Sequence, residues 1–129
     1  MLLPSGERGS SPVEFVLVGT MLTAVTLAVV QFGIAVYVRN VVHDAAVSGA
    51  HAAALADAEL GDGVRRTKEA ITRAVGASYA DDILVARIGG PTPAIEVTVR
   101  TTLPLLGLLG APAALEVVGR APVESFDAP

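Results

Sequence analysis

Residues 15–38 read FVLVGTMLTAVTLAVVQFGIAVYV, a run of 24 residues that contains no Asp, Glu, Lys, Arg or His. A helix of about 20 apolar residues, at a rise of about 1.5 Å per residue, crosses a hydrocarbon core of about 30 Å. The most polar residues of the run are three threonines and Gln31. A threonine hydroxyl can donate to a carbonyl one turn earlier, so it burdens a membrane helix little. The run therefore predicts one membrane-spanning helix.

The composition of the chain agrees with a protein that lies partly in a membrane. Of its 129 residues, 52% are hydrophobic and only 17% are charged, against about 25% charged residues in an ordinary soluble domain. Nine Lys and Arg against thirteen Asp and Glu give a formal net charge of -4. Because there is no excess of cations to neutralise phosphates, we expect no nucleic-acid partner. The sequence has no Cys, which excludes disulfides and thiolate metal sites.

An ordinary secretory signal is one alternative for the apolar run. Such signals have an apolar region of about 7 to 15 residues and a small-residue cleavage site close behind it. Here the run is longer, and the nearest small-x-small pattern, at residues 50–52, lies beyond Arg39 and Asp44. Cleavage there would free a secreted domain that begins near residues 51–57. The charges that flank the run are nearly equal, so they do not orient the helix.

The residues just before the run form a second pattern. Residues 7–15 read ERGSSPVEF, so a polar leader ends at Gly9 and Glu14 is the fifth residue counted from Ser10. This pattern resembles the type III signal that prepilin peptidases cut after Gly. Together with the Ala- and Val-rich residues 38–54 and the strand pattern that follows, it makes the chain similar to the TadE-like family. These are minor pilins or pseudopilins of tight-adherence pili, also called Flp or type IVc pili.

The resemblance implies a function and a set of partners. A prepilin peptidase would cut after Gly9, Ser10 would become the new amino terminus, and Glu14 would be the assembly carboxylate that pairs with a neighbour's amino terminus. The other partners would be pilins or pilus-assembly membrane proteins. The bacterial chain would cross the cytoplasmic membrane once, with its N-terminus inside and its head outside, or be incorporated into an extracellular pilus. The open alternative is an uncut single-pass membrane protein whose extracytoplasmic head binds a protein partner.

The helix is expected to continue past the membrane to Leu60. Its small residues fall within an arc of about 120°, if each residue turns the helix by about 100°; they are Val38, Val41, Val42, Ala45, Gly49, Ala52, Ala53 and Ala56. This stripe would pack within the chain or against a neighbouring subunit's helix. Residues 61–63, Gly-Asp-Gly, are expected to end the helix, and a second helix is expected over residues 64–79. That second helix carries a basic cluster, Arg65, Arg66, Lys68 and Arg73, which would be solvated or would dock on acidic groups.

The last third of the chain has the period of strands. Residues 83–88 and 94–101 predict a hairpin, and residues 115–124 predict a third strand. Pro122 either confines that strand to an edge or ends its pairing early. The apolar, Pro- and Gly-broken residues 103–112 are expected to cross the buried face of the sheet, with a docking surface as the alternative. The predicted fold is α+β and pilin-like. It comprises a cytoplasmic leader (1–9), a long helix (10–60, transmembrane over 15–38) and an exported head (61–129) with a second helix and about three antiparallel strands.

No catalytic or metal-binding group of residues is predicted. His43 and His51 lie about 80° apart around the expected helix and cannot share a metal without a further ligand from elsewhere. No serine lies in a G-x-S-x-G motif, which is the usual setting of a nucleophilic serine in α/β-hydrolases. We therefore expect a protein that is not an enzyme and that has no cofactor.

Overall fold

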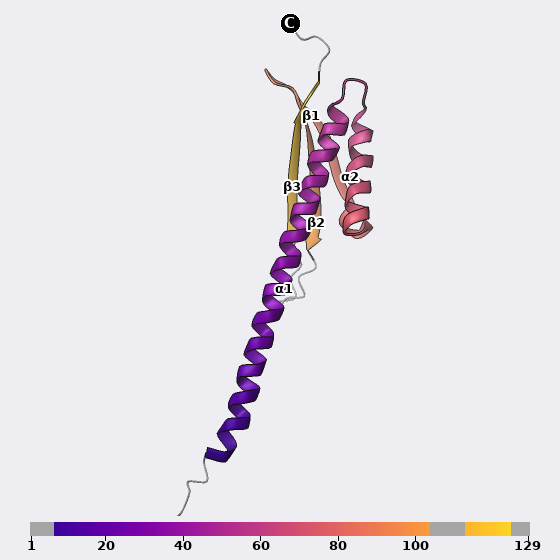
Figure 1. Cartoon of the computed structure of the whole chain (residues 1–129). Helices are drawn as coiled ribbons and strands as arrows, with labels where there is room; N and C mark the ends of the chain where they lie inside the picture. The colour runs from indigo at the N-terminus through magenta and orange to yellow at the C-terminus, as the bar shows by residue number, and fades with distance from the viewer. Residues whose placement is uncertain (1–6, 104–112, 125–129) are drawn as a thin grey trace, which may run out of the picture. The chain divides into compact units, whose positions relative to one another are not determined.

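The computed structural model describes residues 7–103 and 113–124. Its elements are α1 (Glu7–Ala54), α2 (Leu60–Ala74), the short 3-10 helix η1 (Ala77–Tyr79), and the strands β1 (Asp82–Ile88), β2 (Ala94–Leu103) and β3 (Ala113–Pro122) (Figure 1). The predicted α+β class is confirmed: a long apolar N-terminal helix is followed by a second helix and three antiparallel strands. The chain divides into two units, residues 1–34 and 35–129.

The first unit contains the N-terminal part of α1, and its large apolar side chains are exposed. Phe15 is 80% exposed and Leu22 is 66% exposed. The most apolar window of the helix has none of its residues buried within the chain, unlike the core helix of a soluble protein. By its length and composition this helix can cross a membrane.

The threonines of the apolar run make the predicted bonds to the backbone. Each hydroxyl donates to the carbonyl oxygen four residues earlier, over 2.7 to 2.8 Å, in the pairs Thr20 to Val16, Thr23 to Gly19 and Thr26 to Leu22. The polar groups of these side chains are therefore satisfied inside the helix itself. Such bonds are needed in lipid, where no water is present to replace them.

The second unit contains a three-stranded antiparallel sheet in the order β1-β2-β3. Val85 of β1 is opposite Val97 of β2, and Val97 is opposite Gly119 of β3. In the β1–β2 connection Gly90 has a φ of 125°, which favours glycine because it has no Cβ. The predicted hairpin is confirmed. So is the edge position of the third strand, which among the described strands pairs with β2 alone and ends at Pro122.

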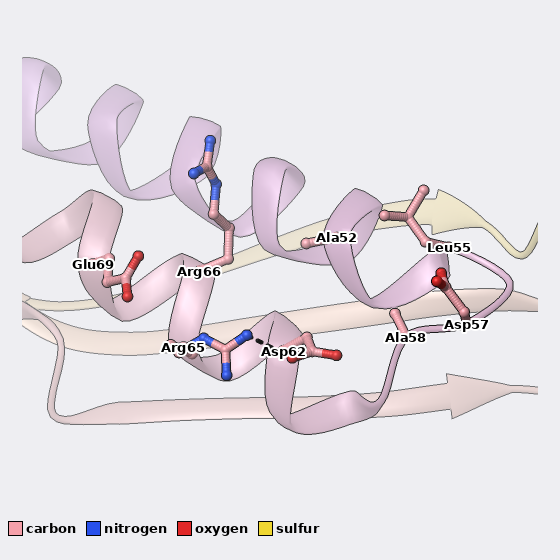
Figure 2. A pocket seen from close by; sticks show the side chains of 8 residues that line it. All are labelled: Ala52, Leu55, Asp57, Ala58, Asp62, Arg65, Arg66 and Glu69. Atoms are coloured by element: carbon pink, nitrogen blue, oxygen red, sulfur yellow. Dashed lines mark hydrogen bonds and ion pairs between the residues drawn. The ribbon is translucent and has the colours of Figure 1, made fainter.

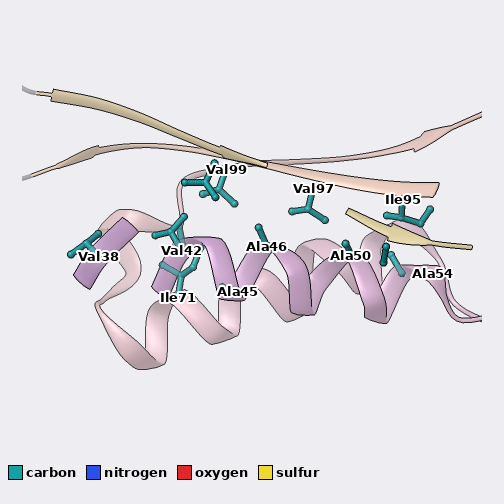
Figure 3. Close-up of a cluster of buried hydrophobic side chains, with 14 residues drawn as sticks. Val38, Val42, Ala45, Ala46, Ala50, Ala54, Ile71, Ile95, Val97 and Val99 are labelled. Atoms are coloured by element: carbon teal, nitrogen blue, oxygen red, sulfur yellow. The ribbon is translucent and has the colours of Figure 1, made fainter. Parts of the chain in front are cut away.

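The core of this unit lies between one face of the sheet and the helices. Figure 3 shows Ile95, Val97 and Val99 of β2 pointing toward small residues of α1, and all three are fully buried. A Cβ added to Gly119 would come within 2.6 Å of the carbonyl carbon of Ala46. The backbones of β3 and α1 therefore touch, which is why only glycine fits there.

Helix α2 packs beside α1 and against β1. A Cβ added to Gly63 would lie 2.9 Å from the Cβ of Ala53, 3.1 Å from the carbonyl oxygen of Gly49 and 3.4 Å from Cγ1 of Val85. The two helices are thus in backbone contact where each carries a glycine. Thr67, which is also fully buried, donates its hydroxyl to the Gly63 carbonyl over 2.8 Å.

The predicted small-residue stripe of α1 is largely confirmed. Its buried members are Val38, Val42, Ala45, Gly49 and Ala53. Ala46, Ala50 and Ala54 are buried as well, because α1 packs against both the sheet and α2 and so needs a wider apolar face. Ala56 is exposed because it lies beyond the end of the helix.

The predicted end of the long helix at Leu60 is wrong. Helix α1 ends at Ala54, whose carbonyl accepts a hydrogen bond from the backbone N–H of Glu124 over 3.0 Å. The glycines at 61 and 63 do not end α1 but lie in the first turn of α2. The prediction that these glycines end the long helix fails because Gly63 is required by a tertiary contact with α1. Local helix propensity does not reveal such a contact.

The predicted bounds of the second helix, 64–79, are also shifted. Helix α2 begins at Leu60, where the N–H of Glu59 donates to the Asp62 carboxylate over 2.8 Å. It ends at Ala74, because Gly76 takes a φ of 116° and the N–H groups of Val75 and Gly76 both bond to the Ile71 carbonyl. Of the predicted apolar connection, residues 104–112 lie outside the described residues; Leu103 ends β2 and is half-buried.

Candidate functional site

The predicted processing motif lies at the start of α1. Gly9, Ser10 and Glu14 are all helical, and all three are exposed. Ser10 and Glu14 are four residues apart, so they lie on neighbouring positions of one helix face. A Cβ added to Gly9 would meet nothing within 4 Å. Packing within the described chain therefore does not require glycine at position 9, although glycine weakens a helix by about 0.5 to 1 kcal/mol relative to alanine.

The same part of the helix contains a proline. Pro12 lies inside α1, past its first turn, where proline has no N–H to donate to the carbonyl four residues earlier. That carbonyl belongs to Arg8, next to Gly9. Proline in a helix interior costs about 3 kcal/mol relative to alanine. Gly9 and Pro12 therefore both weaken the helix beside the Gly9–Ser10 peptide bond.

Glu14 is the charged residue closest to the apolar run on its N-terminal side. Within residues 7–103 and 113–124 its carboxylate forms no ion pair. The helix around it can cross a membrane, and an isolated charge in the apolar phase is costly. The carboxylate thus has a physical reason to pair with a group outside this chain.

A hollow of about 410 Å³ lies between the end of α1 and α2 (Figure 2). Its lining comprises three small or apolar residues and five charged ones: Ala52, Leu55, Ala58, Asp57, Asp62, Arg65, Arg66 and Glu69. In Figure 2 Arg66 extends toward α1 and Arg65 turns to Asp62. The lining has three acids and two bases, and this near balance of charge selects no ligand class.

Local contacts hold two of the cations of α2. Arg65 pairs with Asp62 over 2.6 Å, and Nε of Arg66 donates to the Ser48 hydroxyl over 3.2 Å. The pKa of Asp62 lies below its ordinary value, chiefly because its carboxylate accepts the Glu59 N–H and secondarily because Arg65 stands beside it. The basic cluster is exposed throughout, as a solvated helix face would be.

The two histidines do not meet. Both are exposed on α1, and Nδ1 of His51 is 2.8 Å from the carbonyl oxygen of Val47 in the preceding turn. Among the residues that the structure describes, no group of three His, Asp or Glu side chains is placed to hold a metal.

Two charged pairs on the sheet were missed by sequence reasoning. Arg100 pairs with Glu116 over 2.8 Å, and Arg120 pairs with Glu96 over 2.7 Å, in both cases between β2 and β3. The signal was present in the sequence. Each strand carries a Glu and, four residues later, an Arg. When the two strands pair antiparallel with the midpoints of these segments opposite each other, each Glu lies beside the Arg of the other strand.

The comparison with protein families finds a match that covers the N-terminal part of the chain. Residues 9–51 match the model of the family described as TadE-like protein. No curated protein and no solved structure matches the chain. The match begins at Gly9 and includes Ser10, Glu14, the apolar run and most of the small-residue stripe. The predicted resemblance is thereby confirmed for this region: over residues 9–51 the chain is similar to TadE-like proteins.

Proposed function

We propose that this protein is a minor pilin or pseudopilin that a prepilin peptidase cuts after Gly9 and that takes part in assembly of a tight-adherence, type IVc, pilus. The observation that carries the proposal is the start of the family match at Gly9, followed by Glu14 and a helix apolar enough to span a membrane. In this proposal residues 1–9 are a cytoplasmic leader, residues 15–38 cross the cytoplasmic membrane, and the head of the chain is exported. Other pilins or pilus-assembly membrane proteins are its partners.

The weak start of α1 supports cleavage at this position. A protease takes its substrate in an extended form, so the helical turn that holds the Gly9–Ser10 bond must open first. Gly9 lowers the cost of opening because it is a poor helix former. Pro12 lowers it further because it leaves one carbonyl of that turn without its usual partner. Gly9 also leaves room for close approach, since it has no Cβ.

The environment of Glu14 supports a role in assembly. Its carboxylate stands next to the apolar run and has no ion pair among the described residues. A new amino terminus at Ser10 of a neighbouring subunit would neutralise it. In the apolar phase such neutralisation is worth several kcal/mol, because an unpaired charge is disfavoured there by that amount.

The mature N-terminus tests the processing step. The full chain is produced with and without a prepilin peptidase, and its N-terminal residue is read by mass spectrometry. A chain that begins at Ser10 only when the peptidase is present supports the proposal. Met1 in both preparations favours the uncut membrane anchor, and a residue near 51–57 favours an ordinary secretory signal. Gly9→Leu should stay full length, whereas a leucine at Ser5 should be processed like the parent.

Replacement of Glu14 tests the assembly step separately. Glu14→Ala removes a charge beside the membrane, so insertion should be as good as the parent's or better. Incorporation into pili should fall, because the neighbour's amino terminus loses its partner. Glu14→Asp keeps the charge and serves as the matched control. Parent-level incorporation of Glu14→Ala would contradict the assembly role and leave Glu14 as a residue that favours the helix start.

A further inference from the structure

The outer face of the sheet, opposite the helices, carries an ordered pattern of charge. Reading across the three strands, one row contains Asp82, Arg100 and Glu116. The next outward-facing row contains Leu84, Thr98 and Val118, and the row after that contains Ala86, Glu96 and Arg120. An uncharged row therefore lies between two charged rows. In the first charged row β2 carries the positive charge and β3 the negative one. In the second charged row β2 carries the negative charge and β3 the positive one.

The uncharged row contains two exposed apolar residues. Leu84 is 59% exposed and Val118 is 36% exposed. Three of the four charged side chains that flank the row on β2 and β3 are largely accessible: Arg100, Glu116 and Arg120 are 60, 55 and 67% exposed, whereas Glu96 is 24% exposed. Exposed ion pairs of this kind add little to the stability of a fold. The uncharged row and the charges beside it therefore form a face on which a partner can pack at little cost to the fold.

We propose that this outer face binds the same face of a second copy of the chain. A two-fold axis that runs along the uncharged row places Arg100 opposite the other copy's Glu96, and Glu116 opposite the other copy's Arg120. Each contact occurs twice, as in any isologous interface, so all four charges on β2 and β3 meet an opposite charge. The same axis brings Leu84 against Leu84 and Val118 against Val118. The occupant is thus selected by charge complementarity.

The size of the face predicts a weak association. Three strands spaced about 4.8 Å apart and paired over seven residues cover about 14 Å by 23 Å, or roughly 330 Å². Two such faces bury roughly 700 Å², below the 1,200 Å² or so of a stable complex. We therefore expect binding only where two copies are held close together, as two membrane-inserted chains are, because confinement raises the effective concentration. The inference depends on neither cleavage at Gly9 nor incorporation into a pilus.

A thiol placed on the proposed axis reports the contact. Because the chain has no Cys, Thr98→Cys introduces a single thiol at the centre of the uncharged row. Facing sheets are about 10 Å apart, too far for a direct disulfide, so a short bis-maleimide is used on the full-length chain in membrane vesicles. The control is Thr72→Cys, at an exposed position on α2. We expect crosslinked dimer from Thr98→Cys well above the level given by Thr72→Cys.

Charge swaps then test the complementarity. E96R/R120E keeps the ion pair within the chain, the composition and the net charge, but it sets like charges against each other across the axis. R100E/E116R does the same with the other pair. In the Thr98→Cys background each swap alone should lose the crosslink, and co-expression of the two swapped chains should restore it, because each then meets its opposite. Recovery in the mixture also shows that both variants are folded.

Four results would overturn the proposal. The first is equal crosslinking of Thr98→Cys and Thr72→Cys. The second is a parent-level crosslink in either swap alone, which would mean that the charges do not select the partner. The third is a mixture of the two swaps that crosslinks no better than each swap by itself. A Thr98→Cys adduct with a different protein in place of a second copy would likewise exclude self-association.

Discussion

Gly49→Ala perturbs the closest contact between α1 and α2. The added Cβ would overlap Oγ1 of Thr67 and come within 2.8 Å of the Gly63 carbonyl oxygen and 3.2 Å of the Thr67 Cβ. The Gly63 carbonyl is backbone, and the Thr67 hydroxyl is held by its bond to that same carbonyl. Neither group can yield without separating the two helices.

The expected loss follows from two opposing effects. Insertion of a methyl group into a closely packed site costs about 1 to 3 kcal/mol, and contact with backbone on the far side favours the upper part of that range. Alanine in place of glycine returns about 1 kcal/mol of helix propensity. The net destabilisation is then about 1 to 2 kcal/mol. For a unit of this size each kcal/mol lowers Tm by about 4 to 8 °C, so we expect a drop of about 4 to 16 °C.

Gly61→Ala is the matched control, because it makes the same change in a helix where an added Cβ would meet nothing within 4 Å. Thermal unfolding of the full chain in detergent, followed by circular dichroism, compares both variants with the parent. Gly61→Ala should melt at or slightly above the parent's Tm. A Gly49→Ala protein that also melts at or above the parent's Tm would refute the close contact between α1 and α2.

Three further predictions concern other contacts. Pro12→Ala restores a helical N–H near Gly9 and should slow cleavage by a prepilin peptidase relative to the parent, as measured by the rate at which the precursor disappears; unchanged cleavage would mean that the turn need not open. Thr67→Val keeps the shape of the side chain but removes its hydrogen bond, so it should cost about 1 kcal/mol and lower Tm by about 4 to 8 °C; an unchanged Tm would show that the bond contributes nothing. Because the pKa of Asp62 is lowered in the folded state, its contribution to stability is present above its ordinary value of 3.8 and is lost as pH falls through the lower folded value. The Tm difference between the parent and Asp62→Asn should therefore shrink in acid, and a difference that stays constant or grows would contradict the assignment.

Features that depend on neighbours in the sequence were predicted well. Three threonine hydroxyls donate to carbonyl oxygens of their own helix. The acceptor is one turn away, so these bonds do not depend on the rest of the fold. The hairpin followed from an apolar run and an alternating run joined by residues 89–93, which carry two Gly and two Pro. The processing motif, which stays a prediction, also rests on a local spacing, from Gly9 to Glu14. Its residues could be named from the sequence because no distant contact positions them.

Features that depend on distant contacts were not predicted. The end of α1 was placed at Leu60 because nothing in residues 55–60 forbids a helix. The structure ends it at Ala54, whose carbonyl bonds to Glu124 from the far end of the sheet. Gly63 looks like a helix stop in the sequence, yet it serves a contact with Gly49. A glycine required by packing and a glycine required by a turn are identical in a sequence, and only the neighbour brought by the fold distinguishes them.

The outer face of the sheet illustrates why the order of charges matters more than their number. The ion pairs within the chain require only that β2 and β3 run antiparallel in the observed register, in which Thr98 is opposite Val118. A shift of one residue would turn one strand's charged side chains toward the core, so the buried Val97 and Val99 fix that register. Each of the two strands carries a Glu and, four residues later, an Arg. In this register the four charged residues form the corners of a square in which neighbouring corners have opposite charge, and the centre of the square is uncharged. Two such squares can face each other with opposite charges in contact in two ways, related by a two-fold axis along the uncharged row or by one parallel to the strands, between β2 and β3. Only the axis along the uncharged row also covers Leu84, which is why it is the one that the crosslinking experiment examines.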